Sequence, residues 1–184
     1  MTAISPIIDR VFPKSLANDI TLVISGAVLT ALAAQVVIPM QPVPMTLQTF
    51  AVLLIAAALG PVRAVSSMGL YLAMGAAGLP VFAAAKSLGA VLPTIGYLIG
   101  FIVAGLVVGA LATRGFSSTP TKVAFSFALG SLVIYALGAG WLVIGLGMSP
   151  SAAIAAGVLP FLIGDAVKAI AAAALLPLAW KFIR

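Results

Sequence analysis

The feature that most constrains this chain is an apolar run of membrane-spanning length that contains an acid and a base. Residues 157–177 read GVLPFLIGDAVKAIAAAALLP, in which Asp165 and Lys168 are the charged positions. A helix that rises about 1.5 Å per residue and enters a bilayer near Val158 carries these side chains roughly 10 and 15 Å deep, near the middle of a core about 30 Å thick. A lone ionised side chain at that depth costs about 2.5–3.5 kcal/mol or more. The run therefore predicts a membrane-spanning helix whose charged pair requires polar surroundings.

The spacing of the charged pair leaves two interpretations open. Residues three apart lie on one helix face, so Asp165 and Lys168 can form an internal ion pair that locks the helix to its neighbours. Alternatively they face a ligand cavity together. Gly157, Pro160 and Gly164 loosen the start of the helix on the side from which a ligand would approach, and helix N-termini favour anionic groups.

Composition extends the membrane assignment to the whole chain. Hydrophobic residues make up 64% of the sequence and charged residues 7%, which is typical of an integral membrane protein. The apolar runs are long and do not alternate, so we expect helices and not the strands of a barrel. One membrane domain, residues 1–184, accounts for the length. The first residues mix charges with prolines and lack a processing site, so we expect no cleavable signal peptide.

Missing residue types exclude several kinds of chemistry. The chain has no cysteine and no histidine, which removes disulfides, thiolate nucleophiles, imidazole bases and the usual zinc ligands. The only acids are Asp9, Asp19 and Asp165, so no carboxylate pair is available within the membrane. We expect neither an enzyme nor a metal or cofactor site. The basic residues are scattered between apolar runs, which does not indicate a nucleic-acid partner.

The breaks between apolar runs predict an all-α integral membrane protein, a bundle of six transmembrane helices. Residues 1–19 are expected to form a cytoplasmic, interfacial N-terminal segment. Prolines 39, 42 and 44 interrupt the second run, because a continuous helix cannot cross them, and a second proline-containing connection covers residues 79–93. The spans are expected at about residues 20–38, 47–62, 64–78, 94–113, 123–144 and 158–180.

The distribution of basic residues predicts the orientation. If the N-terminus is cytoplasmic, Lys86 is the one basic residue between spans that falls outside, which satisfies the positive-inside rule. The N- and C-termini are then both cytoplasmic. Connections 39–46, 79–93 and 148–158 share the external face, so the candidate pocket opens outward. The basic residues on the cytoplasmic side are Arg10, Lys14, Arg63, Arg114, Lys122, Lys181 and Arg184.

Small residues recur at four-residue spacing in the first span. Ala27 and Ala31 lie on one flank, beside a second series of Gly26, Thr30 and Ala34. Such a flank lets another helix approach closely. The spacing is compatible with packing inside the bundle and with docking of a separate protein.

Three segments together resemble the BioY family, the biotin-binding substrate components (S components) of energy-coupling factor (ECF) transporters. These segments are PVPMTLQTF at 42–50, GLPVF at 78–82 with PTIGYLIGF at 93–101, and GVLPFLIGDAVKA at 157–169. The resemblance implies a multi-pass protein of the bacterial cytoplasmic (inner) membrane that captures biotin from outside with high affinity. It also implies a transmembrane coupling protein and cytoplasmic ATPases as partners, with Ala27 and Ala31 as the docking flank. No G-x-x-x-x-G-K-[ST] motif occurs, so ATP hydrolysis would belong to those partners.

The resemblance also implies which residues meet biotin. Asp165 can accept hydrogen bonds from the ureido N–H groups, and Lys168 can donate to the ureido carbonyl or pair with the carboxylate. As the one external lysine, Lys86 can attract the anionic ligand, and Phe82 can pack against the thiophane ring. The complete set of expected ligand-binding residues is Thr46, Gln48, Thr49, Phe82, Lys86, Tyr97, Asp165 and Lys168.

One alternative of a different class remains. A single intramembrane aspartate can be a protonation site, so the chain could be a proton-coupled or facilitative porter for another small vitamin-like molecule. An intramembrane enzyme is disfavoured, because histidine, cysteine and a second intramembrane acid are missing.

Overall fold

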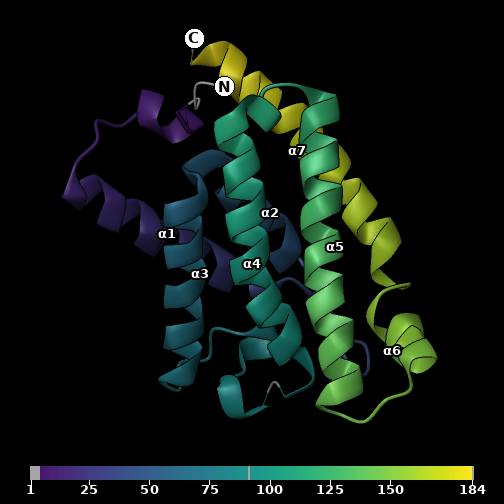
Figure 1. The fold of residues 1–184 in the computed structure, drawn as a ribbon. Helices are drawn as coiled ribbons and strands as arrows, with labels where there is room; N and C mark the ends of the chain where they lie inside the picture. The colour runs from purple at the N-terminus through teal and green to yellow at the C-terminus, as the bar shows by residue number, and fades with distance from the viewer. Residues whose placement is uncertain (1–4, 91, 184) are drawn as a thin grey trace.

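The computed structural model describes residues 5–90 and 92–183, and this part of the chain is mostly helical (Figure 1). Its α-helices are α1 (Leu16–Gln35), α2 (Gln48–Leu59), α3 (Pro61–Ala76), α4 (Ile95–Leu111), α5 (Pro120–Ile144), α6 (Pro150–Gly157) and α7 (Phe161–Phe182). The two strands are β1 (Val37–Ile38) and β2 (Met45–Thr46). Single turns of other helix types cover Ile7–Arg10, Ala83–Ala85, Leu88–Ala90, Leu92–Thr94 and Ala112–Phe116.

Four helices within the described residues are long and apolar enough to cross a membrane. They are α1, α5, α7 and α4 together with the turn that follows it, Ile95–Phe116. Helices α2 and α3 fall in the predicted second and third spans and are shorter, with 12 and 16 residues. The all-helical membrane class is therefore confirmed, while a count of six crossings stays a prediction.

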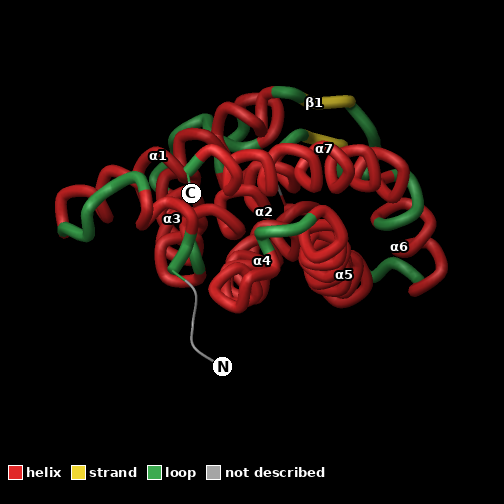
Figure 2. Tube along the Cα trace, turned by 90° about the horizontal axis from the view of Figure 1, so that it is seen from above, coloured by secondary structure: helices red, strands yellow, loops and turns green. Residues whose placement is uncertain are grey.

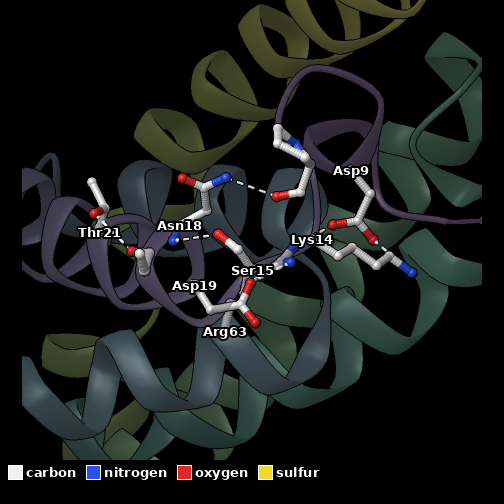
Figure 3. A network of polar contacts seen from close by, with 9 residues as sticks. Asp9, Lys14, Ser15, Asn18, Asp19, Thr21 and Arg63 are labelled. Carbon is white, nitrogen blue, oxygen red and sulfur yellow. Dashed lines mark hydrogen bonds and ion pairs between the residues drawn. The ribbon is translucent and has the colours of Figure 1, made fainter.

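Local signals explain where α1 begins and ends. Ser15 caps the helix by accepting a hydrogen bond from the Asn18 backbone N–H at 3.2 Å, so α1 begins before the predicted residue 20 (Figure 3). It ends at Gln35, because the next residues pair with the chain that returns toward α2. Val37 pairs with Thr46 across the two-stranded hairpin. The first proline-rich connection is thus a hairpin and not only an irregular loop.

Helices α2 and α3 are joined by the single residue Gly60. Its φ of +82° lies in the left-handed region that glycine tolerates. Pro61 follows as the first residue of α3, where its missing N–H is not needed. The last predicted span corresponds to α7, which begins at Phe161 after a break that covers Val158 to Pro160, and α6 lies before it in the predicted 148–158 connection.

Helix α2 is the centre of the bundle. It contacts α1, α3, α4, α5 and α7, and the view along the bundle shows these helices around it (Figure 2). Its residues are apolar on every side apart from the first turn, as expected for a helix that is buried all round. The polar first turn, which contains Gln48 and Thr49, points to the interior of the bundle at one end.

Most of the predicted cytoplasmic basic residues lie on the N-terminal segment and on the helix ends near the C-terminal end of α7, which are at the other end of the bundle (Figure 1). The Arg10 guanidinium lies 4.8 Å from the Trp180 ring centre. Arg63 donates to the Asp9 and Asp19 carboxylates at 2.6 and 2.7 Å (Figure 3). These contacts hold the N-terminal segment against the bundle. Arg184 lies outside the described residues.

The small flank of α1 faces the interior. Ala27 is completely buried, Ala31 is partly buried, and a Cβ added at Gly26 would lie 2.5 Å from the Ser67 hydroxyl oxygen of α3. The structure thus favours internal packing for this flank. Docking of a partner through Ala27 and Ala31 stays a prediction, and it requires α1 to separate from its neighbours.

Candidate ligand site

A cavity lies at the end of the bundle opposite the N-terminal segment. About 40 Å³ of it is open to a water-sized sphere, whereas small-molecule sites range from about 300 to 1,000 Å³, so its walls would have to move apart around a ligand. We call it the inner cavity. Its walls come from the first connection, α2, the 79–93 connection, α4, α5 and α7. The lining residues are Val43, Pro44, Thr46, Gln48, Thr49, Phe82, Ala83, Thr94, Tyr97, Leu98, Phe101, Ile134, Tyr135, Phe161 and Lys168.

The inner cavity brings together most of the predicted ligand-binding residues, although they are spread along the chain. Asp165 and Lys86 are the two predicted residues that do not line it. Those that do line it are Thr46, Gln48, Thr49, Phe82, Tyr97 and Lys168. The tertiary structure thus brings residues of the three quoted motifs together, although these motifs lie far apart in the sequence.

Asp165 lies behind the cavity wall, and both of its carboxylate oxygens accept hydrogen bonds. Its Oδ1 accepts from the Thr49 hydroxyl at 3.0 Å and from Lys168 Nζ at 2.7 Å, and its Oδ2 accepts from the Tyr135 hydroxyl at 2.5 Å. Only 8% of the side chain is exposed. The internal ion pair therefore exists. Direct contact between Asp165 and a ligand stays a prediction, because the ligand would have to displace one of these hydrogen-bond donors.

Lys168 stands at the cavity surface with its ammonium group paired. Besides Asp165, Nζ donates to the Thr46 carbonyl oxygen at 2.8 Å and to the Thr49 hydroxyl at 2.7 Å. An ammonium group has three N–H donors, so all of them are used. These bonds tie α7 to the first turn of α2 and to the end of the hairpin. They also place a positive charge where a ligand acceptor could exchange with the Thr46 carbonyl.

Gln48 connects the cavity to the second long connection. Its Oε1 accepts from the Thr46 hydroxyl at 2.9 Å, and its Nε2 donates to the Tyr71 hydroxyl at 2.6 Å. Tyr71 in turn donates to the Val81 carbonyl oxygen at 3.1 Å. This chain of hydrogen bonds orients the Gln48 amide and fixes the segment that precedes Phe82.

Two aromatic side chains form rigid apolar walls. The Phe82 ring packs edge-on against Tyr71, with centroids 5.2 Å apart at 84°. The Tyr97 hydroxyl donates to the Gly157 carbonyl oxygen at 2.7 Å, and a Cβ at Gly138 would lie 2.3 Å from the Tyr97 ring. Both rings are therefore held in place and present apolar surface to a ligand.

Lys86 lines a second, outer cavity of about 500 Å³. The walls of the outer cavity are the two proline-rich connections, and Pro44, Ala83 and Thr94 belong to both cavities. The two spaces therefore adjoin. Lys86 is exposed. It lines the outer cavity, whereas Lys168 lines the inner cavity.

Tyr135 is the residue of the candidate site that sequence reasoning missed. It lines the cavity and bonds Asp165. A signal existed, because Tyr135 is one of three tyrosines in the chain and lies in a long apolar run, where a hydroxyl requires a partner. Which helix face it occupies could not be determined from that run.

The sequence profile of the BioY family matches residues 6–184. The chain belongs to the BioY family. It is 40% identical over 159 residues to the probable biotin transporter BioY of Pyrococcus horikoshii, covering 83% of this chain and 90% of that protein. The biotin transporter BioY of Thermotoga maritima is 39% identical over 161 residues, covering 82% and 90%.

A solved structure has the same fold as this BioY chain. The crystal structure of the S-component for biotin from an ECF-type ABC transporter matches with a TM-score of 0.77, over 91% of this chain and 95% of that one. The two sequences are 22% identical over the match. The match shows a shared fold.

Proposed function

We propose that this BioY protein is a high-affinity biotin-binding and uptake component that works with a transmembrane coupling protein and ATPases of an ECF-type transporter. The observation that carries the proposal is the position of Lys168 in the wall of a largely apolar cavity, in a chain of this family. Relatives named as biotin transporters and the S-component fold support the same assignment. They do not favour the alternative, a proton-coupled or facilitative porter for another vitamin-like molecule.

Biotin matches the chemistry of the inner cavity. The ureido carbonyl would accept from Lys168, the ureido N–H groups would donate toward Thr49 and Asp165, and the thiophane would pack between Phe82 and Tyr97. Thr46 and Gln48 complete the polar wall through their hydroxyl and amide groups. The carboxylate would point to the outer cavity, where Lys86 provides a positive charge.

The topology we propose has six crossings, both termini in the cytoplasm, and the outer cavity open to the exterior of a bacterial cytoplasmic membrane. The gathering of basic residues at the end of the bundle opposite the cavities supports this orientation. In this topology α2 and α3 are the short crossings, and residues 1–184 form one membrane domain. The coupling protein would meet α1, including the flank of Ala27 and Ala31, when α1 moves away from α3.

The direct test is equilibrium binding of purified protein to a panel of vitamins. Biotin should bind more tightly than every other member of the panel. Tighter binding of another vitamin would overturn the assignment. Radiolabelled uptake in vesicles, with and without a proton gradient, then separates uptake driven by partner ATPases from proton coupling.

A further inference from the structure

The wall between the two cavities is a short segment of the 79–93 connection. Phe82 lines the inner cavity, Ala84 and Lys86 line the outer one, and Ala83 lines both. A hydrogen bond from the Phe82 N–H to the Lys86 carbonyl oxygen, at 2.9 Å, closes this segment into a tight loop. We call residues 81–86 the partition loop. A ligand that passes from the outer to the inner cavity must pass beside it.

The backbone of the partition loop is strained. Ala84 and Ala85 have φ values of +58° and +56°, in the left-handed region that residues with a Cβ rarely occupy. Two consecutive alanines in this region are unfavourable without support from their surroundings. The loop conformation is therefore maintained by contacts with other parts of the chain.

One side chain from another element bonds both ends of the loop. The Gln35 Oε1 accepts a hydrogen bond from the Ala85 N–H at 3.0 Å, and Nε2 donates to the Phe82 carbonyl oxygen at 3.3 Å and to the Val81 carbonyl oxygen at 3.5 Å. Gln35 is the last residue of α1 and also donates to the Ala31 carbonyl oxygen of its own helix at 3.0 Å. The amide is thus anchored on α1 and clamps the loop. Gln35 lines neither cavity, so it acts without touching a ligand.

We propose that Gln35 is a positioning residue that holds the partition loop closed and so sets the rate at which ligand enters and leaves the inner cavity. The inference rests on the proposed function for the identity of the ligand, biotin, while loop closure itself is independent of it. Replacing Gln35 removes support from a strained loop at both of its ends. The Phe82 backbone then loses its hydrogen bond from Gln35, so the Phe82 ring is held less firmly at the cavity, although its contact with Tyr71 remains.

The first experiment needs no ligand. Because the chain has no cysteine, Ala83→Cys introduces a single thiol at a position that is 8% exposed. Modification by a maleimide should be slow in this protein and about ten-fold faster when Gln35→Ala is added, since each of the lost hydrogen bonds is individually modest. An unchanged rate would overturn the proposal.

Two controls make the labelling result specific. Thr21→Ala removes another α1 side chain whose hydroxyl bonds only its own helix, at the Ala17 carbonyl oxygen, and should leave the labelling rate unchanged. Lys86→Cys places the thiol on the exposed end of the loop and should react fast with or without Gln35. Hydrogen exchange of the Phe82 N–H gives the same comparison without any cysteine, because that amide is released only when the loop opens.

The second experiment measures biotin exchange. In Gln35→Ala, association and dissociation of radiolabelled biotin should both accelerate, dissociation by about ten-fold, with the melting temperature of the ligand-free protein unchanged. Gln35→Glu keeps the acceptor for Ala85 and loses the donor to Phe82, so it should be intermediate. Unaltered rates in Gln35→Ala would overturn the proposal. A parent protein that does not bind biotin would instead refute the proposed function, and the labelling experiment would still decide the role of the loop.

Discussion

Asp165 and Lys168 form an ion pair that is embedded in a larger set of hydrogen bonds. Thr49 contacts both members, and Tyr135 reaches the carboxylate from α5. A pair that only locked helices together would not need to face a cavity. Here the ammonium group lines the inner cavity while the carboxylate stands behind it. This arrangement suggests a division of roles, in which Asp165 orients the groups that Lys168, Thr49 and Tyr135 present.

The double variant Asp165→Leu/Lys168→Met separates a structural pair from a ligand site. Removing one partner leaves a buried charge unpaired, at a cost of about 3–5 kcal/mol, whereas removing both largely avoids that cost. We therefore expect the double variant to insert and purify normally and to show no rise in melting temperature with biotin. A double variant that binds biotin like the parent would refute the assignment of the site.

Tyr135→Phe tests the residue that the structure adds to the site. The change leaves Asp165 Oδ2 without its donor, which costs about 1–3 kcal/mol for a buried acceptor. We expect a lower melting temperature and biotin binding weakened by about ten-fold. Equilibrium binding and thermal unfolding measure the two effects. The control is Ser131→Ala one turn earlier on α5, which should bind as the parent does, and equal losses in both variants would contradict a specific role for Tyr135.

At the scale of elements, α1 has two distinct sides and an important end. One flank packs into the bundle, the other exposes large apolar residues such as Ile24, Val28 and Leu32, and the C-terminal residue Gln35 reaches the partition loop. The end of α1 is also the start of the hairpin that carries Thr46. Movement of α1 would therefore also displace the two proline-rich connections that line the cavities.

Ala27→Leu distinguishes packing from docking on α1. Ala27 is fully buried, and overpacking a dense site typically costs about 1–3 kcal/mol. We expect a lower melting temperature in the isolated protein, while Val28→Leu on the exposed side should have little effect. Thermal unfolding and ATP-dependent uptake are measured in parallel. If Ala27→Leu keeps the parental melting temperature and loses only uptake, the flank serves docking and not internal packing.

At the scale of the whole molecule, the bundle has two chemically different ends. The end with the N-terminal segment contains the Arg63 contacts to Asp9 and Asp19 and the Arg10 contact to Trp180. The other end contains the two cavities and the two proline-rich connections that line them. This polarity is what the proposed topology requires.

Accessibility labelling of single cysteines tests the topology. Thr119 before α5 and Ser151 in α6 are both exposed, and they lie at opposite ends of the bundle. In intact cells an impermeant maleimide should label Ser151→Cys, and Thr119→Cys should react only after the membrane is permeabilised. Labelling of both positions in intact cells would contradict the six-helix arrangement.

The sequence by itself determined the membrane class, the helical structure, the breaks at prolines and the shared helix face of Asp165 and Lys168. These properties depend on local composition and spacing, which a single segment contains. The small residues Ala27 and Ala31 could likewise be recognised as a flank for close helix contact, but the spacing did not say which helix makes that contact.

Only the tertiary structure decided which side of each helix faces inward. In a membrane, lipid and protein interior are both apolar, so a helix such as α2 or α5 shows no polar stripe that would reveal its buried face. For that reason Tyr135 in the cavity wall, Asp165 behind it, Ala27 in the interior and Gln35 on the partition loop could not be predicted. Each is a contact between residues far apart in the chain, and it exists only once the helices have packed together.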